Sequence, residues 1–176
     1  MLSRVVPGVN CAGTALFALT GLILLAGLPA RASVIAVPGH HATVQAAMNA
    51  AQNGDTVIVA PGTYVENLTW PSGRTFTLQS QDPTSATVVA ATILDGGAAG
   101  PVIALGGGAG SVLAGFTITN GRTASLGGGI KGNGSYATIR NNVITGNYTG
   151  LYGGGIYGSG GLIENNRIAA NQGRSG

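Results

Sequence analysis

Short apolar runs rich in valine, isoleucine and threonine follow one another along the chain from residue 56 onward. Glycine, proline, asparagine or aspartate bounds each run, as is typical of short β-strands joined by turns. No sustained helical period follows residue 54, which excludes architectures that alternate strands with helices. The runs predict strands over residues 56–60, 63–70, 74–80, 86–96, 101–105 and 111–121.

One helical pattern precedes these strands. Apolar residues recur at the spacing i, i+3, i+4, i+7, with Thr43 placed to cap the N-terminus and Asn53-Gly54 placed to end the helix. A single apolar stripe on a helix of about three turns does not make a domain, so we expect this helix to cover another part of the fold. The stripe consists of Val44, Ala47, Met48 and Ala51.

Two Gly-Gly-Gly-Ile segments, at 127–130 and 153–156, belong to a longer repeat. Residues 111–121, 137–147 and 161–171 fall into register, with offsets of 26 and 24 residues. Repeats of this length, built from strands without helices, are typical of β-solenoids, whereas propeller blades need ~40 residues or more. The predicted inward columns are Leu113 with Ile139 and Ile163, Ile118 with Ile144 and Ile168, and Ile130 with Ile156.

The repeat length is sufficient for one coil of a solenoid. At ~3.3 Å per residue, a coil of this length has room for three short strands, and successive coils stack ~4.8 Å apart. We interpret Asn141 and Asn165 as an inward asparagine ladder beside a turn. Their neighbours Asn142 and Asn166 are interpreted as the left-handed residues that a sharp bend requires. The sequence thus predicts an all-β fold.

The first thirty-two residues have the features of a secretory signal peptide. Arg4 precedes an uncharged apolar stretch at 11–28, and Ala30-Arg31-Ala32 supplies a small-residue cleavage pattern. We predict cleavage after Ala32, and a secreted or cell-surface protein that meets the membrane only through this segment. An uncleaved membrane anchor is the alternative, because the stretch reaches the ~18 residues of a spanning candidate.

Composition narrows the class of protein further. Charged residues make up only 7% of the chain and glycine supplies 32 residues, without the strict period of collagen. Removal of residues 1–32 leaves six basic residues against five acidic ones, so no argument for nucleic-acid binding remains. The chain's one cysteine, Cys11, leaves with that segment. The remainder has no thiol for a disulfide, a zinc site or a nucleophile.

The chain resembles the right-handed parallel β-helix proteins of the pectate-lyase-like superfamily. Residues 43–68 are similar to their entry segment, in which a capping helix leads through a Gly-Asp-Thr-Val strand and a Pro-Gly-Thr-Tyr turn into the first coil. Residues 92–97 and 116–121 are similar to the strand-to-turn signature of the family. The Gly-Gly-Gly-Ile repeats also resemble those of polymorphic outer-membrane autotransporter passengers.

This resemblance implies a right-handed parallel β-helix with a short N-terminal capping α-helix. We expect a capping segment over 33–54 and coils over 55–176. The third repeat ends at Gly176, before a third Gly-Gly-Gly-Ile segment, so we also expect further coils in a longer chain. The superfamily spans lyases, hydrolases and adhesins, so the resemblance leaves the activity open.

The acidic residues do not form a recognisable catalytic or metal site. Pectate lyases of this fold gather acidic residues around calcium, and polygalacturonases use clustered aspartates; this sequence shows neither arrangement. Catalytic residues are therefore left unassigned, no cofactor or metal site is predicted, and calcium is implied only by the resemblance. His40 and His41 are interpreted as part of a solvated turn. Structural roles are expected for Asp55, Glu66, Asp82 and Asp95, and an exposed ion pair with Arg140 for Glu164.

A binding surface is expected where the repeat presents basic and aromatic side chains outward. Lys131 and Tyr157 each follow the inward isoleucine of a Gly-Gly-Gly-Ile segment, and the turns before them carry Arg122, Tyr148 and Tyr152. Tyrosine rings suit sugar rings, and lysine or arginine suits uronate groups. The resemblance implies that substrates lie along this sheet. The leading hypothesis is a protein that binds or processes a polysaccharide or cell-surface glycan; the alternatives are a non-enzymatic adhesin or stalk and an ordinary solvated face.

Overall fold

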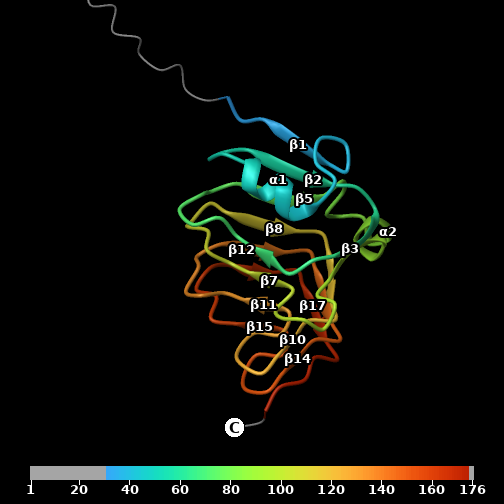
Figure 1. Ribbon diagram of the computed structural model, residues 1–176, viewed down its shortest axis with the longest axis vertical. Helices are drawn as coiled ribbons and strands as arrows, with labels where there is room; N and C mark the ends of the chain where they lie inside the picture. Colours follow the sequence, from blue (N-terminus) through green and yellow to red (C-terminus); the bar gives the residue numbers. More distant parts are fainter. Residues whose placement is uncertain (1–30, 175–176) are drawn as a thin grey trace, which may run out of the picture. The chain divides into compact units, whose positions relative to one another are not determined.

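Residues 31–174 are described by the computed structural model, and they form a parallel β-solenoid of about five turns. All sheets are parallel, and equivalent strands of successive turns lie side by side (Figure 1). The predicted parallel β-helix is therefore confirmed. The predicted signal peptide, residues 1–32, lies almost wholly outside the described residues and stays a prediction.

Four parallel sheets form the walls of the solenoid. The six-stranded sheet contains, in order, β1 (Val34–Val37), β2 (Thr56–Val59), β5 (Thr77–Ser80), β8 (Val112–Ala114), β12 (Thr138–Arg140) and β16 (Ile163–Glu164). The five-stranded sheet contains β3 (Gly62–Val65), β6 (Thr92–Asp95), β9 (Thr117–Thr119), β13 (Val143–Thr145) and β17 (Arg167–Ala169). The four-stranded sheet contains β4 (Leu68–Thr69), β7 (Ile103–Ala104), β11 (Ile130–Lys131) and β15 (Ile156–Tyr157), and the two-stranded sheet contains β10 (Arg122–Thr123) and β14 (Tyr148–Thr149).

The predicted apolar columns are confirmed by the strand register. Ile139 pairs with Leu113 on one side and with Ile163 on the other. The second column, of Ile118, Ile144 and Ile168, and the third, of Ile130 and Ile156, are also in register. The members in the inner turns are fully buried and form the core between the sheets.

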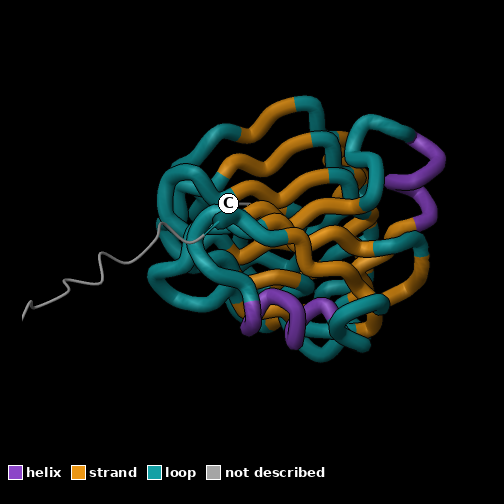
Figure 2. Tube along the Cα trace, turned by 90° about the horizontal axis from the view of Figure 1, so that it is seen from above, coloured by secondary structure: helices purple, strands orange, loops and turns teal. Residues whose placement is uncertain are grey.

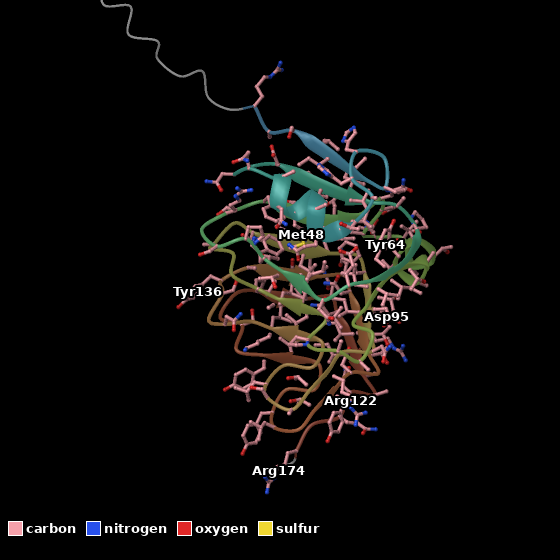
Figure 3. The ribbon with its side chains drawn as sticks, in the orientation of Figure 1. Met48, Tyr64, Asp95, Arg122, Tyr136 and Arg174 are labelled. Atoms are coloured by element: carbon pink, nitrogen blue, oxygen red, sulfur yellow. The ribbon has the colours of Figure 1, made fainter. Side chains whose placement is uncertain are left out.

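A short helix, α1 (Val44–Ala50), packs against β1, β2 and β4 near the N-terminal end of the solenoid. The Thr43 side chain accepts a hydrogen bond from the backbone N–H of Ala46, as predicted for a cap. Val44, Ala47 and Met48 are fully buried, and Met48 points into the interior (Figure 3). The apolar stripe of the helix thus covers the core at this end.

The predicted strand over 86–96 is wrong in its first half, where a second helix, α2 (Ala86–Ala91), precedes β6. The hydroxyl of Ser85 accepts a hydrogen bond from the N–H of Val88, and the carboxylate of Asp82 accepts from the N–H groups of Thr84 and Ser85. These caps favour a helix even though the segment contains β-branched residues. The helix stands at the side of the stacked strands (Figure 2), which also corrects the expectation of no helix after residue 54.

The asparagine ladder lies one position later than predicted. Asn141 and Asn165 have φ angles of 57° and 53°, so they are the left-handed residues of the bend. Asn142 is buried, and its Oδ1 accepts from the N–H of Phe116 at 3.0 Å. Asn166 repeats this bond one turn later, where its Oδ1 accepts from the N–H of Asn142 at 2.9 Å. The ladder is therefore made by Asn142 and Asn166, because the inward side chain follows the left-handed residue.

A second asparagine ladder lies where the five-stranded sheet meets the two-stranded sheet. The Oδ1 of Asn147 accepts from the N–H of Gly121 at 2.8 Å, and that of Asn171 accepts from the N–H of Asn147 at 3.1 Å. The amide of Asn147 also donates to the carbonyl of Ile118. Two corners of the coil are thus held by the same type of side-chain bond between neighbouring turns.

The chain's single tryptophan lies in the core of the early turns. Trp70 is 2% exposed, and its ring stacks on that of Phe76 with a centroid distance of 4.3 Å and an interplanar angle of 14°. Its Nε1 donates a hydrogen bond to the carbonyl of Arg74 at 3.1 Å. The ring's one polar group is therefore satisfied inside the core.

Candidate functional site

The structure brings Arg122 and Tyr148 together. They are partners in the register between β10 and β14, so they occupy the same position in successive turns. The guanidinium carbon of Arg122 lies 4.8 Å from the centroid of the Tyr148 ring, within the range of a cation–π interaction. The interaction holds one face of the tyrosine ring against the arginine. Tyr148 is therefore better suited to orienting Arg122 than to stacking that face on a sugar.

A hollow of about 370 Å³ opens beside this pair. Arg122 extends outward from the surface of the solenoid (Figure 3). A guanidinium carries several N–H donors in a planar fork, and a stacked one is held in a defined orientation. The hollow therefore suits a small anionic group such as a carboxylate. Its lining residues are Ala98, Arg122, Thr123, Ala124, Tyr148 and Gly150.

Lys131 and Tyr157 form a second pair in register, between β11 and β15. The lysine is half-buried, and the tyrosine is 38% exposed. Each follows an isoleucine of the inward column, so both side chains point away from the core. The predicted outward placement of this pair therefore agrees with the register of the strands.

The glycine-rich turns place Tyr152 beside the second pair. Gly153 has a φ of 73°, and a Cβ added to it would lie 2.6 Å from the Cβ of Tyr157. Only glycine fits so close to the following strand in this conformation. Tyr152 directly precedes Gly153 and is 51% exposed. The triple-glycine turn therefore brings the backbone of Tyr152 against the strand that carries Tyr157.

Paired backbone segments connect the two pairs. The N–H of Gly127 donates to the carbonyl of Tyr152 at 3.1 Å, and three further bonds of this kind follow as far as Ile130. Both turns therefore run in parallel from the first pair to the second. We call the residues that they connect the basic-aromatic surface, and they are Arg122, Lys131, Tyr148, Tyr152 and Tyr157.

The lining residue Ala98 was not predicted from the sequence. It comes from the turn after β6, where its φ of 56° and a hydrogen bond from its N–H to the carbonyl of Asn120 set its position. This turn lies outside the registered repeats, so the period of 24 to 26 residues did not reach it. Tyr136 was also missed; it is exposed and lies against Gly160 of the next turn, close to where the glycine's Cβ would be.

Two carboxylates in the described residues hold the N-terminal end together. Asp55 is buried and accepts hydrogen bonds from the N–H groups of Gln52 and Ser33, each at 2.8 Å. These backbone bonds, that of Gln52 foremost, hold the pKa of Asp55 below its usual value. Glu66 accepts from the N–H groups of Val44 and Gln45, each at 2.9 Å, and so caps the first turn of α1. The structural roles expected for these two residues agree with the bonds.

The remaining acidic residues also serve the turns or face solvent. Asp82 caps the turn before α2, where the Thr84 hydroxyl and backbone N–H donate to it and lower its pKa. Asp95 accepts from the N–H of Gly97 and the amide of Asn120. Glu164 is in register with Arg140 as predicted, but the two side chains form no ion pair within residues 31–174.

The residues present do not fit a calcium ion at the basic-aromatic surface. Calcium takes six or more oxygen ligands, usually with several carboxylates among them. The surface supplies two cations and three phenols instead. Among residues 31–174, no group of three His, Cys, Asp or Glu side chains is placed to hold a metal ion. No step of a mechanism is therefore derived through calcium.

Within the same described range, none of the helices combines the length and the apolar character needed to cross a membrane. Comparison of the chain with protein-family models, with curated proteins and with solved structures gives no match. The function of the chain is therefore inferred from the geometry of the basic-aromatic surface.

Proposed function

We propose that this protein is a β-helix that binds an acidic polysaccharide along the basic-aromatic surface. The observation that carries the proposal is the stacking of Arg122 on Tyr148, at 4.8 Å, beside a hollow of about 370 Å³. A carboxylate in that hollow receives a charge-assisted hydrogen bond from a guanidinium that is already oriented. Orientation before binding reduces the entropy that the side chain loses when the ligand arrives.

The second pair, together with Tyr152, extends the surface by one further charge and two rings. Lys131 places an ammonium group on the neighbouring sheet, at the other end of the paired turns. Tyr152 and Tyr157 are exposed and offer rings for the apolar faces of sugars. A chain of uronate residues supplies both kinds of partner, because each sugar ring of the polymer carries a carboxylate.

Binding without chemistry is the form of this function that the side chains support best. Glycan-cleaving enzymes of the common kind need a pair of carboxyl groups that face the scissile bond. Here Asp55, Glu66, Asp82 and Asp95 accept hydrogen bonds that form caps and turns. We assign the protein, on this basis and on its resemblance to the pectate-lyase-like superfamily, to exported or surface-held glycan-binding β-helices. A surface stalk that carries such a binding face is the alternative within this class.

The test is calorimetric titration of the full chain with polygalacturonate and, separately, with neutral galactan. We expect binding of the acidic polymer only, and weaker binding at higher ionic strength. Arg122→Gln removes the charge and Tyr148→Leu removes the ring that orients it, so each is expected to lower the affinity about tenfold. Arg140→Gln, which removes a similar charge from the six-stranded sheet, should leave the affinity unchanged.

Two results would decide against this function. Equal affinity for the neutral polymer, or unchanged affinity in the Arg122 and Tyr148 variants, would show that the oriented charge does not recognise the ligand. Unsaturated products and new reducing ends are followed in the same samples, with and without calcium. Their release would show that the chain processes the glycan as well. Attachment to cells without binding to any uronan would favour the adhesive stalk.

A further inference from the structure

The basic-aromatic surface is divided between two turns of the solenoid by chemical type. Arg122 and Lys131 lie in one turn, and we call them the basic row. Tyr148, Tyr152 and Tyr157 lie in the next turn, and we call them the aromatic row. The strand register places Arg122 beside Tyr148 and Lys131 beside Tyr157. Each row therefore contains one kind of binding group, and the two rows run side by side.

The columns that cross these rows along the solenoid axis are mixed instead. One column consists of Thr69, Ala104, Lys131 and Tyr157. The other continues from Arg122 through Tyr148 to Gln172. A ligand that followed either column would meet one charge and one ring. A ligand that followed the turns would meet two charges along one edge and exposed rings along the other.

A uronate residue has the shape to contact both rows at once. Its carboxylate is bonded directly to the sugar ring, and neighbouring turns lie only ~4.8 Å apart. A sugar ring stacked on the exposed ring of Tyr157 therefore has its carboxylate within reach of Lys131, the register partner of that tyrosine. At the other end of the rows, Tyr148 orients the guanidinium of Arg122 beside the hollow. A second carboxylate of the same polymer can bind there.

We infer that the acidic polysaccharide lies around the solenoid, parallel to the strands, and not along the solenoid axis. Its carboxylates face the basic row, and its sugar rings lie over the aromatic row. The inference rests on the proposed function, because it describes how the same surface recognises its ligand. It also narrows the ligand to linear polymers with two or more uronate residues in the bound stretch, because the two cations lie at opposite ends of the paired turns.

The test exchanges the two members of each register pair. Arg122→Tyr combined with Tyr148→Arg moves the first charge into the aromatic row, and Lys131→Tyr combined with Tyr157→Lys moves the second. Each exchange preserves the composition of its column, and the first also preserves that of the hollow, which both residues line. A ligand along the axis would meet the same groups as before. A ligand along the turns would meet one charge on each edge.

Calorimetric titration with polygalacturonate compares the wild type, each exchange alone and the two exchanges combined. Each exchange alone is expected to lower the affinity about tenfold, because one cation has left its row. The combined exchange brings both charges into one row again, so its affinity should return to within about threefold of the wild type. Circular dichroism of the four proteins verifies that the fold is retained, as expected for side chains that point away from the core.

A second ligand tests the need for two carboxylates. Polygalacturonate in which methyl esters leave only isolated carboxylates keeps the sugar rings but presents one charge to each bound stretch. The wild type is expected to bind this polymer about tenfold more weakly than the unesterified one. Equal affinity for the two polymers would overturn the requirement for two uronate residues.

The outcomes separate this inference from the proposed function. A wild type that does not bind polygalacturonate contradicts the function, and the inference with it. A wild type that binds, with unchanged affinity in either exchange alone, keeps the function and overturns the orientation around the solenoid. A combined exchange that binds no better than the single ones also overturns it, because the losses would then come from the individual positions and not from the separation of the two charges.

Discussion

Adjacent asparagines at the corner of a coil have different physical roles. Asn141 has a left-handed backbone, which asparagine tolerates better than most residues, and its side chain is not part of the ladder. Asn142 is buried with its amide inside the solenoid, where it bonds three backbone groups of its own and the neighbouring turn. The two residues are identical in the sequence, and the position of the left-handed residue in the bend decides which asparagine side chain points inward.

This difference predicts losses of stability of different size for substitutions at the two neighbouring positions. Asn142→Ala leaves the N–H of Phe116 and the carbonyl of Leu113 buried without their partner. We expect a loss of about 3 kcal/mol in the free energy of unfolding, because unsatisfied buried groups are costly. Asn141→Gly keeps the left-handed backbone and removes only an amide outside the ladder. It is expected to change stability by less than about 1 kcal/mol.

Urea titration followed by circular dichroism measures both variants. Similar losses of stability in the two would show that the ladder does not distinguish the positions. If the side chain of Asn141 pointed inward instead, the larger loss in the free energy of unfolding would occur in the Asn141 variant.

At the scale of elements, the columns and most strands could be predicted from the sequence. Repetition fixes which residues stack, since a side chain that is inward in one coil is inward in the next. The segments at 63–70 and 111–121 each form two short strands, because a bend at the corner interrupts the apolar run. Helix α2 could not be predicted, because its caps at Asp82 and Ser85 lie in a region without a repeat to compare.

The candidate site could likewise be predicted only where its residues belong to the repeat. The register of the Gly-Gly-Gly-Ile repeats correctly paired Lys131 with Tyr157. The pairing of Arg122 with Tyr148 was not predicted, although the same offset separates the two residues. The contact of Arg122 with the face of the Tyr148 ring depends on side-chain conformations, which strand register leaves open. Ala98 lines the hollow from the turn after β6, which lies outside the registered repeats. Features that do not recur from coil to coil could not be predicted from the repeat.

The segment between β5 and β6, residues 81–91, contains α2, and we call it the α2 arm. Its residue Pro83 lies close to Gly115 of the solenoid. A Cβ added to Gly115, whose φ is 81°, would lie 2.4 Å from the Cα of Pro83 and 2.4 Å from Ser80 Oγ. Gly115→Ala is therefore expected to push the arm away from the corner and to destabilise the protein. Gly134→Ala is the matched control, because its φ is 74° and nothing lies within 4 Å of the added carbon.

Both variants share the strain of alanine at positive φ, so their difference isolates the clash. We expect Gly115→Ala to be less stable than Gly134→Ala by about 2 kcal/mol in urea unfolding, as for an overpacked site. Equal stability of the two would mean that the arm yields freely and is not held by the corner.

At the scale of the whole molecule, the solenoid is a stack in which each turn contacts its neighbours. Stability in such stacks is local, and turns with fewer neighbours open more easily. The early turns have α1 on one side and buried columns on the other, whereas the final rung is covered on one side within the described residues. The resistance of the backbone to opening should therefore fall from β2 and β5 toward β16 and β17.

Amide hydrogen exchange read by mass spectrometry tests this gradient. Peptides that contain β2 and β5 are expected to exchange most slowly, and those that contain β16 and β17 most rapidly. Uniform protection along the described residues would show that the stack opens as one unit.

The position of Trp70 gives this gradient an optical signal. The indole is stacked on Phe76 in the early turns, whereas four of the five tyrosines lie after residue 135, in the later ones. Tryptophan emission and tyrosine absorbance therefore come from different ends of one small molecule. Fluorescence and ultraviolet difference spectra, recorded on the same unlabelled sample, distinguish a molecule that unravels from one end from a molecule that melts all at once.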